Sequence, residues 1–100
     1  MLNGRHGYSQ KGPDPASASY YYSVPQLRVA GIVRRGERRD TVTGQGWLDH
    51  EWSNAYLDAQ SAGWDWVGLN LDDGGALMAF RIRSRDGRQR WAGATLARAD

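Results

Sequence analysis

The chain has 100 residues and no cysteine, so it holds one domain at most and forms no disulfide or thiolate nucleophile. Thirteen basic and eleven acidic side chains leave a net charge of +2, which is too mild for a dedicated nucleic-acid-binding protein. No apolar run approaches the roughly 20 residues of a membrane-spanning helix, and the N-terminus lacks the apolar segment of a signal peptide. We therefore expect the chain as given to be soluble.

Residues 1–17 are rich in Gly, Ser and Pro and predict an irregular lead-in. Residues 18–100 change to short runs of alternating apolar and polar residues with turn residues between them, which is the pattern of one all-β domain. Pro25 is expected to end the first strand, and residues 54–63 to form a loop that could hold one helical turn. The predicted strands are Ala18–Val24, Leu27–Arg34, Asp40–Ser53, Trp64–Leu71, Ala76–Arg83 and Gln89–Leu96.

The connections between these strands carry their own signals. "RRGER", "DDGG" and "RDG" read as hairpin turns. Gly44 and Gly46, within the third predicted strand, indicate a bulge, a bend or the close approach of a ligand. The first turn is expected to be a solvated hairpin tip, with a phosphate-binding patch as the alternative, because it gathers Arg34, Arg35, Arg38 and Arg39.

Successive hairpins in chain order form an antiparallel meander, which must close into a barrel or protect its edges. A closed barrel with room for a ligand generally needs about eight strands. About six strands fall short of that number. We therefore expect part of a larger barrel, or a unit that associates with itself or pairs with further strands.

The stretch "GWLDHEWS" concentrates two tryptophans, one histidine and two carboxylates. Strand alternation puts Trp47, Asp49 and Glu51 on one face and His50 and Trp52 on the other. Each face then sets a titratable group beside large apolar neighbours, which is the usual setting of proton donors. The alternative is structural, because Trp and His are tolerated in sheet cores when their N–H groups find partners.

The block "GWDWVGLNLDD" follows the same rule, with Trp64 and Trp66 on one face and Asp65 on the other. Several catalytic classes can be excluded for both blocks. A zincin needs a second histidine one helical turn after its "HE" pair, where this chain has Asn54, and two histidines without cysteine argue against a tight zinc site. No G-x-S-x-G elbow or phosphate-binding glycine loop is present.

The pair Asp49 and Glu51 invites comparison with a glycosidase. Both carboxylates, however, point the same way from one strand, whereas glycosidase carboxylates flank a bond from two sides. The arrangement of these two carboxylates on one strand therefore argues against a glycosidase.

Three blocks resemble successive signature blocks of the carotenoid 1,2-hydratase and AttH-type lipocalin-like proteins: "YYSVPQLRVAG", "VTGQGWLDHEWS" and "GWDWVGLNLDDGGALMAFRIRSRDG". The lead-in also resembles the segment that precedes those blocks. The resemblance implies that residues 18–100 form part of a lipocalin-like β-barrel, the central portion of a longer protein with two such barrels. Characterised members add water to the terminal C=C bond of an acyclic carotenoid without a cofactor. Other members are exported or lipid-anchored proteins of unknown activity, some associated with transporters.

The resemblance also implies site residues. His50 and Trp52 match the His and Trp of a proposed active-site pair, which places their face of the strand toward the cavity, and Asp49 matches the preceding aspartate. Asp65 is the candidate for a further acid downstream. Protonation of a trisubstituted alkene gives a tertiary cation, so the reaction needs a positioned acid and a nearby aromatic face. The expected ligand-binding residues are Tyr22, Trp47, Trp52, Trp64 and Trp66.

Two functions follow from the resemblance. The first is acid-catalysed hydration of a long apolar isoprenoid or polyene, in which Asp49 or Asp65 donates the proton and His50 orients the water. The second is a non-catalytic lipocalin-like domain that binds such a ligand or assists a transporter. Either function requires a hydrophobic small molecule as partner, and neither requires a nucleic acid, a metal or a cofactor. The full-length parent is expected in the periplasm, outside the cell or at a membrane.

Overall fold

The computed structural model describes residues 1–100 and contains six antiparallel strands and no helix. The all-β prediction is therefore confirmed. The strands form two three-stranded sheets with the orders β1-β2-β3 and β4-β5-β6. Their bounds are β1 Tyr8–Gln10, β2 Ala18–Arg35, β3 Arg38–Ala55, β4 Ser61–Asn70, β5 Ala76–Ser84 and β6 Gln89–Ala97.

The first two predicted strands are one continuous strand, β2, so the expectation that Pro25 ends a strand was wrong. The register with β3 shifts between Val24 and Leu27, which makes Pro25 and Gln26 a bulge. Gln26 takes a positive φ of 56° there. Proline lacks an N–H group for the strand ladder, and a bulge is one of the few places in a sheet that tolerates it.

The lead-in contributes a strand that the sequence did not predict. β1 pairs with the start of β2, from Tyr8 opposite Tyr20 to Gln10 opposite Ala18, and Leu2 forms an isolated bridge with Tyr22. Residues 1–17 are therefore only partly irregular. The helical turn considered for residues 54–63 is absent, because the chain bends at residues 56–60 and β4 begins at Ser61.

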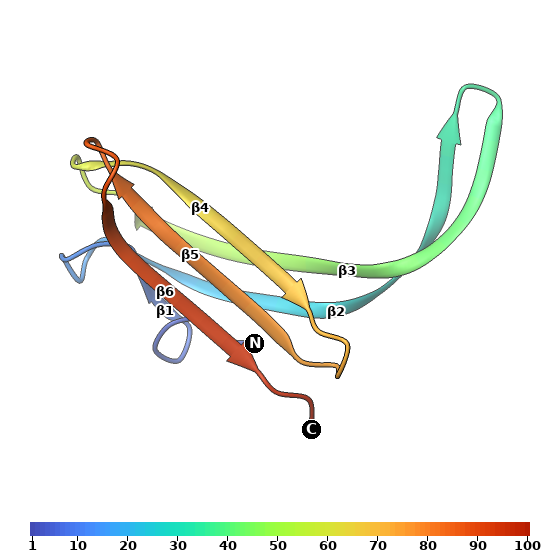
Figure 1. Ribbon diagram of the computed structural model, residues 1–100, viewed down its shortest axis with the longest axis horizontal. Helices are drawn as coiled ribbons and strands as arrows, with labels where there is room; N and C mark the ends of the chain where they lie inside the picture. Colours follow the sequence, from blue (N-terminus) through green and yellow to red (C-terminus); the bar gives the residue numbers. More distant parts are fainter.

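The meander is interrupted between β3 and β4, which do not pair, so residues 1–100 contain no closed barrel. Figure 1 shows the β4-β5-β6 sheet lying across the first part of the β2-β3 hairpin. The bulge holds the two sheets together, since the backbone N–H of Gln26 donates to Asn70 Oδ1 at 2.8 Å. The Gln26 side-chain amide also donates to the carbonyl of Gly75 at 2.8 Å.

The core between the sheets is small. The buried apolar side chains are Ala18, Tyr21, Ala76, Met78 and Ile82, while seven buried residues are polar or charged, four of them serines on or near β1 and β2. Alternation along β5 puts Met78, Phe80 and Ile82 inward, as the sequence pattern predicts. The interior is consequently a mixed one, in which hydrogen bonds must satisfy many buried polar groups.

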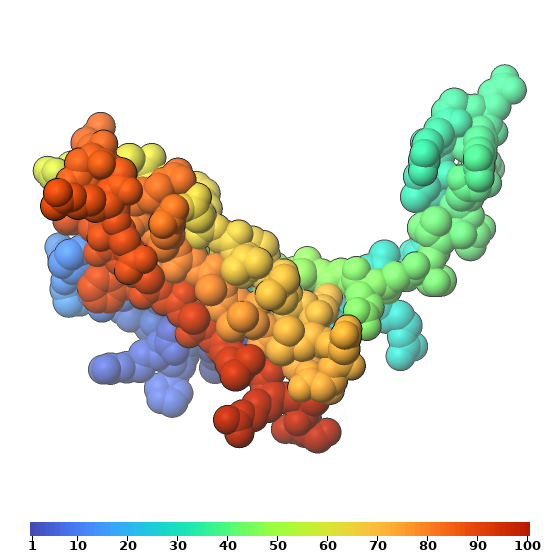
Figure 2. All heavy atoms as spheres, in the orientation of Figure 1, coloured from blue at the N-terminus to red at the C-terminus, as the bar shows by residue number.

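The distal half of the β2-β3 hairpin extends beyond the region that the β4-β5-β6 sheet covers, and we call this half the arm (Figures 1 and 2). Ile32, Val33 and Val42 on this arm are all exposed. The radius of gyration is 16.6 Å, against about 13 Å for a compact chain of this length. The fold is therefore open, with a body in which the two sheets face each other and an arm that is the distal half of the β2-β3 hairpin.

Candidate functional site

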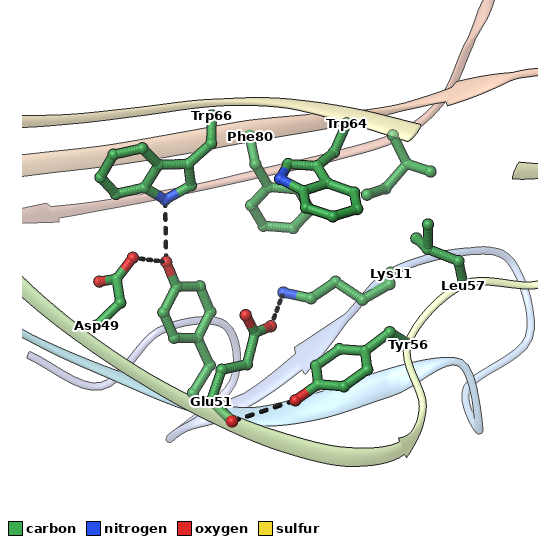
Figure 3. Close-up of a pocket in the computed structure, with 10 residues that line it drawn as sticks. Lys11, Asp49, Glu51, Tyr56, Leu57, Trp64, Trp66 and Phe80 are labelled. Atoms are coloured by element: carbon green, nitrogen blue, oxygen red, sulfur yellow. Dashed lines mark hydrogen bonds and ion pairs between the residues drawn. The ribbon is translucent and has the colours of Figure 1, made fainter. Parts of the chain in front are cut away.

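A cavity of about 660 Å³ lies between the two sheets, and we call it the hollow (Figure 3). β2 and β3 supply one side, β4 and β5 the other, and the segments after β1 and β3 supply the rest. Seven of its ten lining residues are hydrophobic. The ten are Lys11, Tyr21, Asp49, Glu51, Tyr56, Leu57, Trp64, Trp66, Phe80 and Ile82.

Strand alternation brings Asp49 and Glu51 to the hollow. The register pairs Glu51 with Tyr21 and Asp49 with Ser23, so these four side chains share the inner face of the β2-β3 ladder. The extra residues that shift this register lie at Pro25 and Gln26 in β2 and after Trp52 in β3. A bulge at Gly44 or Gly46 would have turned the Asp49 side chain to the other face of β3. Neither glycine carries one, so Asp49 keeps the direction that strand alternation predicts.

Asp49 is held by three hydrogen bonds. The hydroxyl of Tyr21 donates to Asp49 Oδ2 at 2.7 Å, and Ser23 Oγ and Trp47 Nε1 donate to Oδ1 at 2.5 and 2.6 Å. Trp66 Nε1 donates to the Tyr21 hydroxyl at 3.0 Å, which extends the network from one sheet to the other. Burial, and then the bond to Asp49, raise the pKa of the Tyr21 hydroxyl above its ordinary value. The Tyr21 hydroxyl therefore keeps its proton and is the donor in the hydrogen bond to Asp49.

Glu51 forms an ion pair with Lys11, the only lysine in the chain. Lys11 Nζ lies 2.9 Å from Glu51 Oε1, donates to Ser9 Oγ at 2.8 Å, and approaches the ring centres of Phe80 and Tyr21 at 4.3 and 4.7 Å. Lys11 is only 6% exposed, and this burial lowers its pKa although Glu51 acts in the opposite direction. The hollow thus contains a desolvated amine between two aromatic rings.

Tryptophans form the opposite wall of the hollow, as the sequence predicts for Trp64 and Trp66 on one face of β4. Trp64 is 61% exposed and Trp66 43% exposed, so this side of the hollow is open to solvent. Trp47 is not among the lining residues, but it makes an edge-to-face contact with Trp66, with ring centres 6.0 Å apart. The edge-on geometry is one that aromatic pairs prefer.

His50, Trp52 and Tyr22 lie on the outer face of the β2-β3 ladder, away from the hollow. Tyr22 and His50 are register partners and share a hydrogen bond of 3.1 Å between the phenol oxygen and Nδ1. The rings of His50 and Trp52 lie 5.0 Å apart, and Tyr20 stacks on Trp52. Within this chain the cavity is therefore on the Asp49 face, whereas the resemblance favoured the His50 face.

Asp65 also lies outside the hollow. Arg81 Nε and Arg83 Nη1 donate to its two oxygens at 2.6 and 2.7 Å. The Arg81 bond and the charge of both guanidinium groups hold the pKa of Asp65 below its usual range. An acid that must deliver a proton near neutral pH needs the opposite shift.

Four lining residues were not among the site residues predicted from the sequence: Lys11, Tyr21, Tyr56 and Phe80. Tyr21 lies on the same face of the ladder as Asp49. The sequence could have shown this only if the register between β2 and β3 had been known. Lys11 had one signal in the sequence, because every other basic residue is an arginine. Phe80 had a signal in the alternation of β5, which puts it on the same face as Met78 and Ile82, whereas Tyr56 had none.

No group of three or more His, Asp and Glu side chains lies close enough to hold a metal ion. The structure also contains no helix with the length and apolarity of a membrane span. The hollow therefore offers aromatic surface, two carboxylates and one amine as its chemical groups.

A comparison with protein-family models matches the AttH-like family over residues 1–100. The chain belongs to the AttH-like family. A crystal structure from Nitrosomonas europaea, described as an AttH, is 56% identical to this AttH-like chain and superposes over 96% of it with a TM-score of 0.92. The match covers 30% of that protein, so this chain spans less than a third of its length. A comparison with curated proteins finds no match.

Proposed function

We propose that the hollow binds a long apolar ligand of the isoprenoid, polyene or lipid-like class. The observation that carries this proposal is the aromatic lining of a cavity of about 660 Å³, a volume within the range of small-molecule sites. Trp64, Trp66 and Phe80 offer ring faces and edges to a polyene, while the polar groups gather at one side. The chain belongs to the AttH-like family. The resemblance of its sequence to AttH-type lipocalin-like proteins supports the proposal.

Titration with retinol, a neutral polyene, tests the proposal through quenching of tryptophan fluorescence. Trp64→Ala removes a half-exposed wall of the hollow, and Trp52→Ala removes a similarly exposed indole from the outer face. Trp64→Ala is expected to weaken binding about tenfold, since loss of an aromatic anchor costs about 1–2 kcal/mol, whereas Trp52→Ala should leave the affinity unchanged. Absence of saturable quenching in the wild type, or a loss confined to Trp52→Ala, would refute the proposal.

Hydration of a polyene C=C bond is a second candidate, and it uses the opposite face of β3. The cluster of His50, Trp52 and Tyr22 supports it, because a histidine that can orient water lies 5.0 Å from an indole that can stabilise a carbocation. Asp65 is held ionised by its arginines, and Asp49 points into the hollow on the other face of β3, so the acid for this reaction would have to come from a group outside this cluster.

The hydration candidate predicts a tertiary alcohol when the chain is incubated with an acyclic carotenoid. His50→Ala should abolish the product, and His6→Asn, which changes the only other histidine, should not. Asparagine suits the control because His6 has a positive φ of 53°, which Asn tolerates. Equal activity of wild type and His50→Ala, or no product from any of the three, would exclude the role given to His50.

A further inference from the structure

The polar groups of the hollow form one cluster, the carboxylate corner, made of Asp49, Glu51 and Lys11. All three side chains line the cavity and lie across it from the aromatic side chains of β4 and β5 (Figure 3). Two carboxylates and one ammonium give the corner a formal charge of −1. Burial lowers the pKa of Lys11, and loss of its proton would only make the corner more negative. The corner is thus net negative in either form of Lys11.

The two carboxylates differ in what they can offer a ligand. Asp49 has donors on both oxygens, from Tyr21, Ser23 and Trp47. The Glu51 side chain receives both of its polar contacts, from Ser19 Oγ and Lys11 Nζ, on Oε1. Its other oxygen, Oε2, is therefore the one carboxylate oxygen of the corner that accepts no hydrogen bond from the chain.

The charge of Lys11 is already paired within the chain. Its ammonium already contacts Glu51 Oε1 and Ser9 Oγ and lies against the Phe80 and Tyr21 rings. A ligand carboxylate that reached Lys11 would also come close to Glu51 and Asp49 in a partly desolvated space, where like charges repel strongly. A hydroxyl group at the same point would instead donate to Glu51 Oε2.

We propose that the hollow selects apolar ligands whose polar end is neutral and donates a hydrogen bond, such as an alcohol, and rejects the corresponding carboxylates. This inference rests on the proposed binding function and names the chemistry of its ligand. The aromatic walls determine that the ligand is apolar, and the carboxylate corner determines which end group it carries.

Three ligands with the same polyene chain test the inference: retinol, methyl retinoate and retinoate. Each is titrated into the wild-type chain, with quenching of tryptophan fluorescence as the readout. Retinol is expected to bind most tightly, methyl retinoate about threefold more weakly for lack of a donor, and retinoate at least about tenfold more weakly than retinol because of charge repulsion. Equal affinities, or tightest binding of retinoate, would overturn the inference but leave the binding function standing. If none of the three binds, the proposed function itself fails.

The variant Glu51→Gln tests the origin of the selectivity. It removes one negative charge and the open carboxylate oxygen, so the difference between retinol and retinoate should shrink by about tenfold. Glu37→Gln is the matched control, because Glu37 is the only other glutamate and lies exposed at the tip of the arm. An unchanged ratio in folded Glu51→Gln would overturn the inference. If that variant does not fold, the series of three ligands on the wild type still decides the question.

Discussion

Replacement of Tyr21 by Phe is expected to weaken the link between the two sheets. The Tyr21 ring is 3% exposed, and its hydroxyl donates to Asp49 in one sheet and accepts from Trp66 in the other. A hydrogen bond to a charged group contributes about 1.5–3 kcal/mol and a neutral one about 0.5–1.5 kcal/mol. Phenylalanine fills the same space, so no cavity adds to the loss. We expect a decrease of about 2 kcal/mol in the free energy of unfolding, because removal of the buried hydroxyl recovers part of its desolvation cost.

Urea denaturation followed by circular dichroism measures this loss, and Tyr20→Phe provides the control. Tyr20 is the preceding residue on the same strand, is 54% exposed on the outer face, and its stacking on Trp52 does not need the hydroxyl. Tyr20→Phe should therefore change the stability by less than about 0.5 kcal/mol. Equal stabilities of the two variants would refute the view that the Tyr21 hydroxyl joins the sheets.

Two further changes have expected outcomes. Asp58→Asn should destabilise the chain at neutral pH, because hydrogen bonds from Arg90 lower the pKa of Asp58 to about 2. The folded pKa lies below the ordinary value of about 4, so this stabilisation is complete above pH 4 and is lost as the pH falls through 2. Urea denaturation of wild type and variant should therefore converge as the pH falls toward 2, and a difference as large at pH 2 as at neutral pH would contradict the assignment. Gly68→Ala should displace the Trp66 indole, since a Cβ at position 68 would lie 2.5 Å from its Cη2 atom. The near-ultraviolet circular dichroism should change and retinol binding should weaken, whereas wild-type behaviour in both assays would show that the indole can move aside at no cost.

Much of the fold follows from local patterns in the sequence. The alternation in "GWLDHEWS" correctly separated Trp47, Asp49 and Glu51 from His50 and Trp52, because side chains in a strand alternate irrespective of the rest of the fold. The turn signals likewise placed the three hairpins. The failures were non-local: β1 forms only because residues 8–10 find an open edge of β2, and Pro25 sits within a strand only because a bulge accommodates it.

The candidate site divides in the same way. The sequence determined that each strand has two chemically different faces, and that Trp64 and Trp66 point together. It did not determine which face of β3 would be covered, since that depends on where the β4-β5-β6 sheet packs. This packing puts the hollow on the Asp49 side and brings Lys11, from a segment far away in the chain, against Glu51. Alternation is a property of each strand, whereas burial is a property of two sheets that meet, so the sequence determined the faces and the tertiary structure alone decided which one became the cavity.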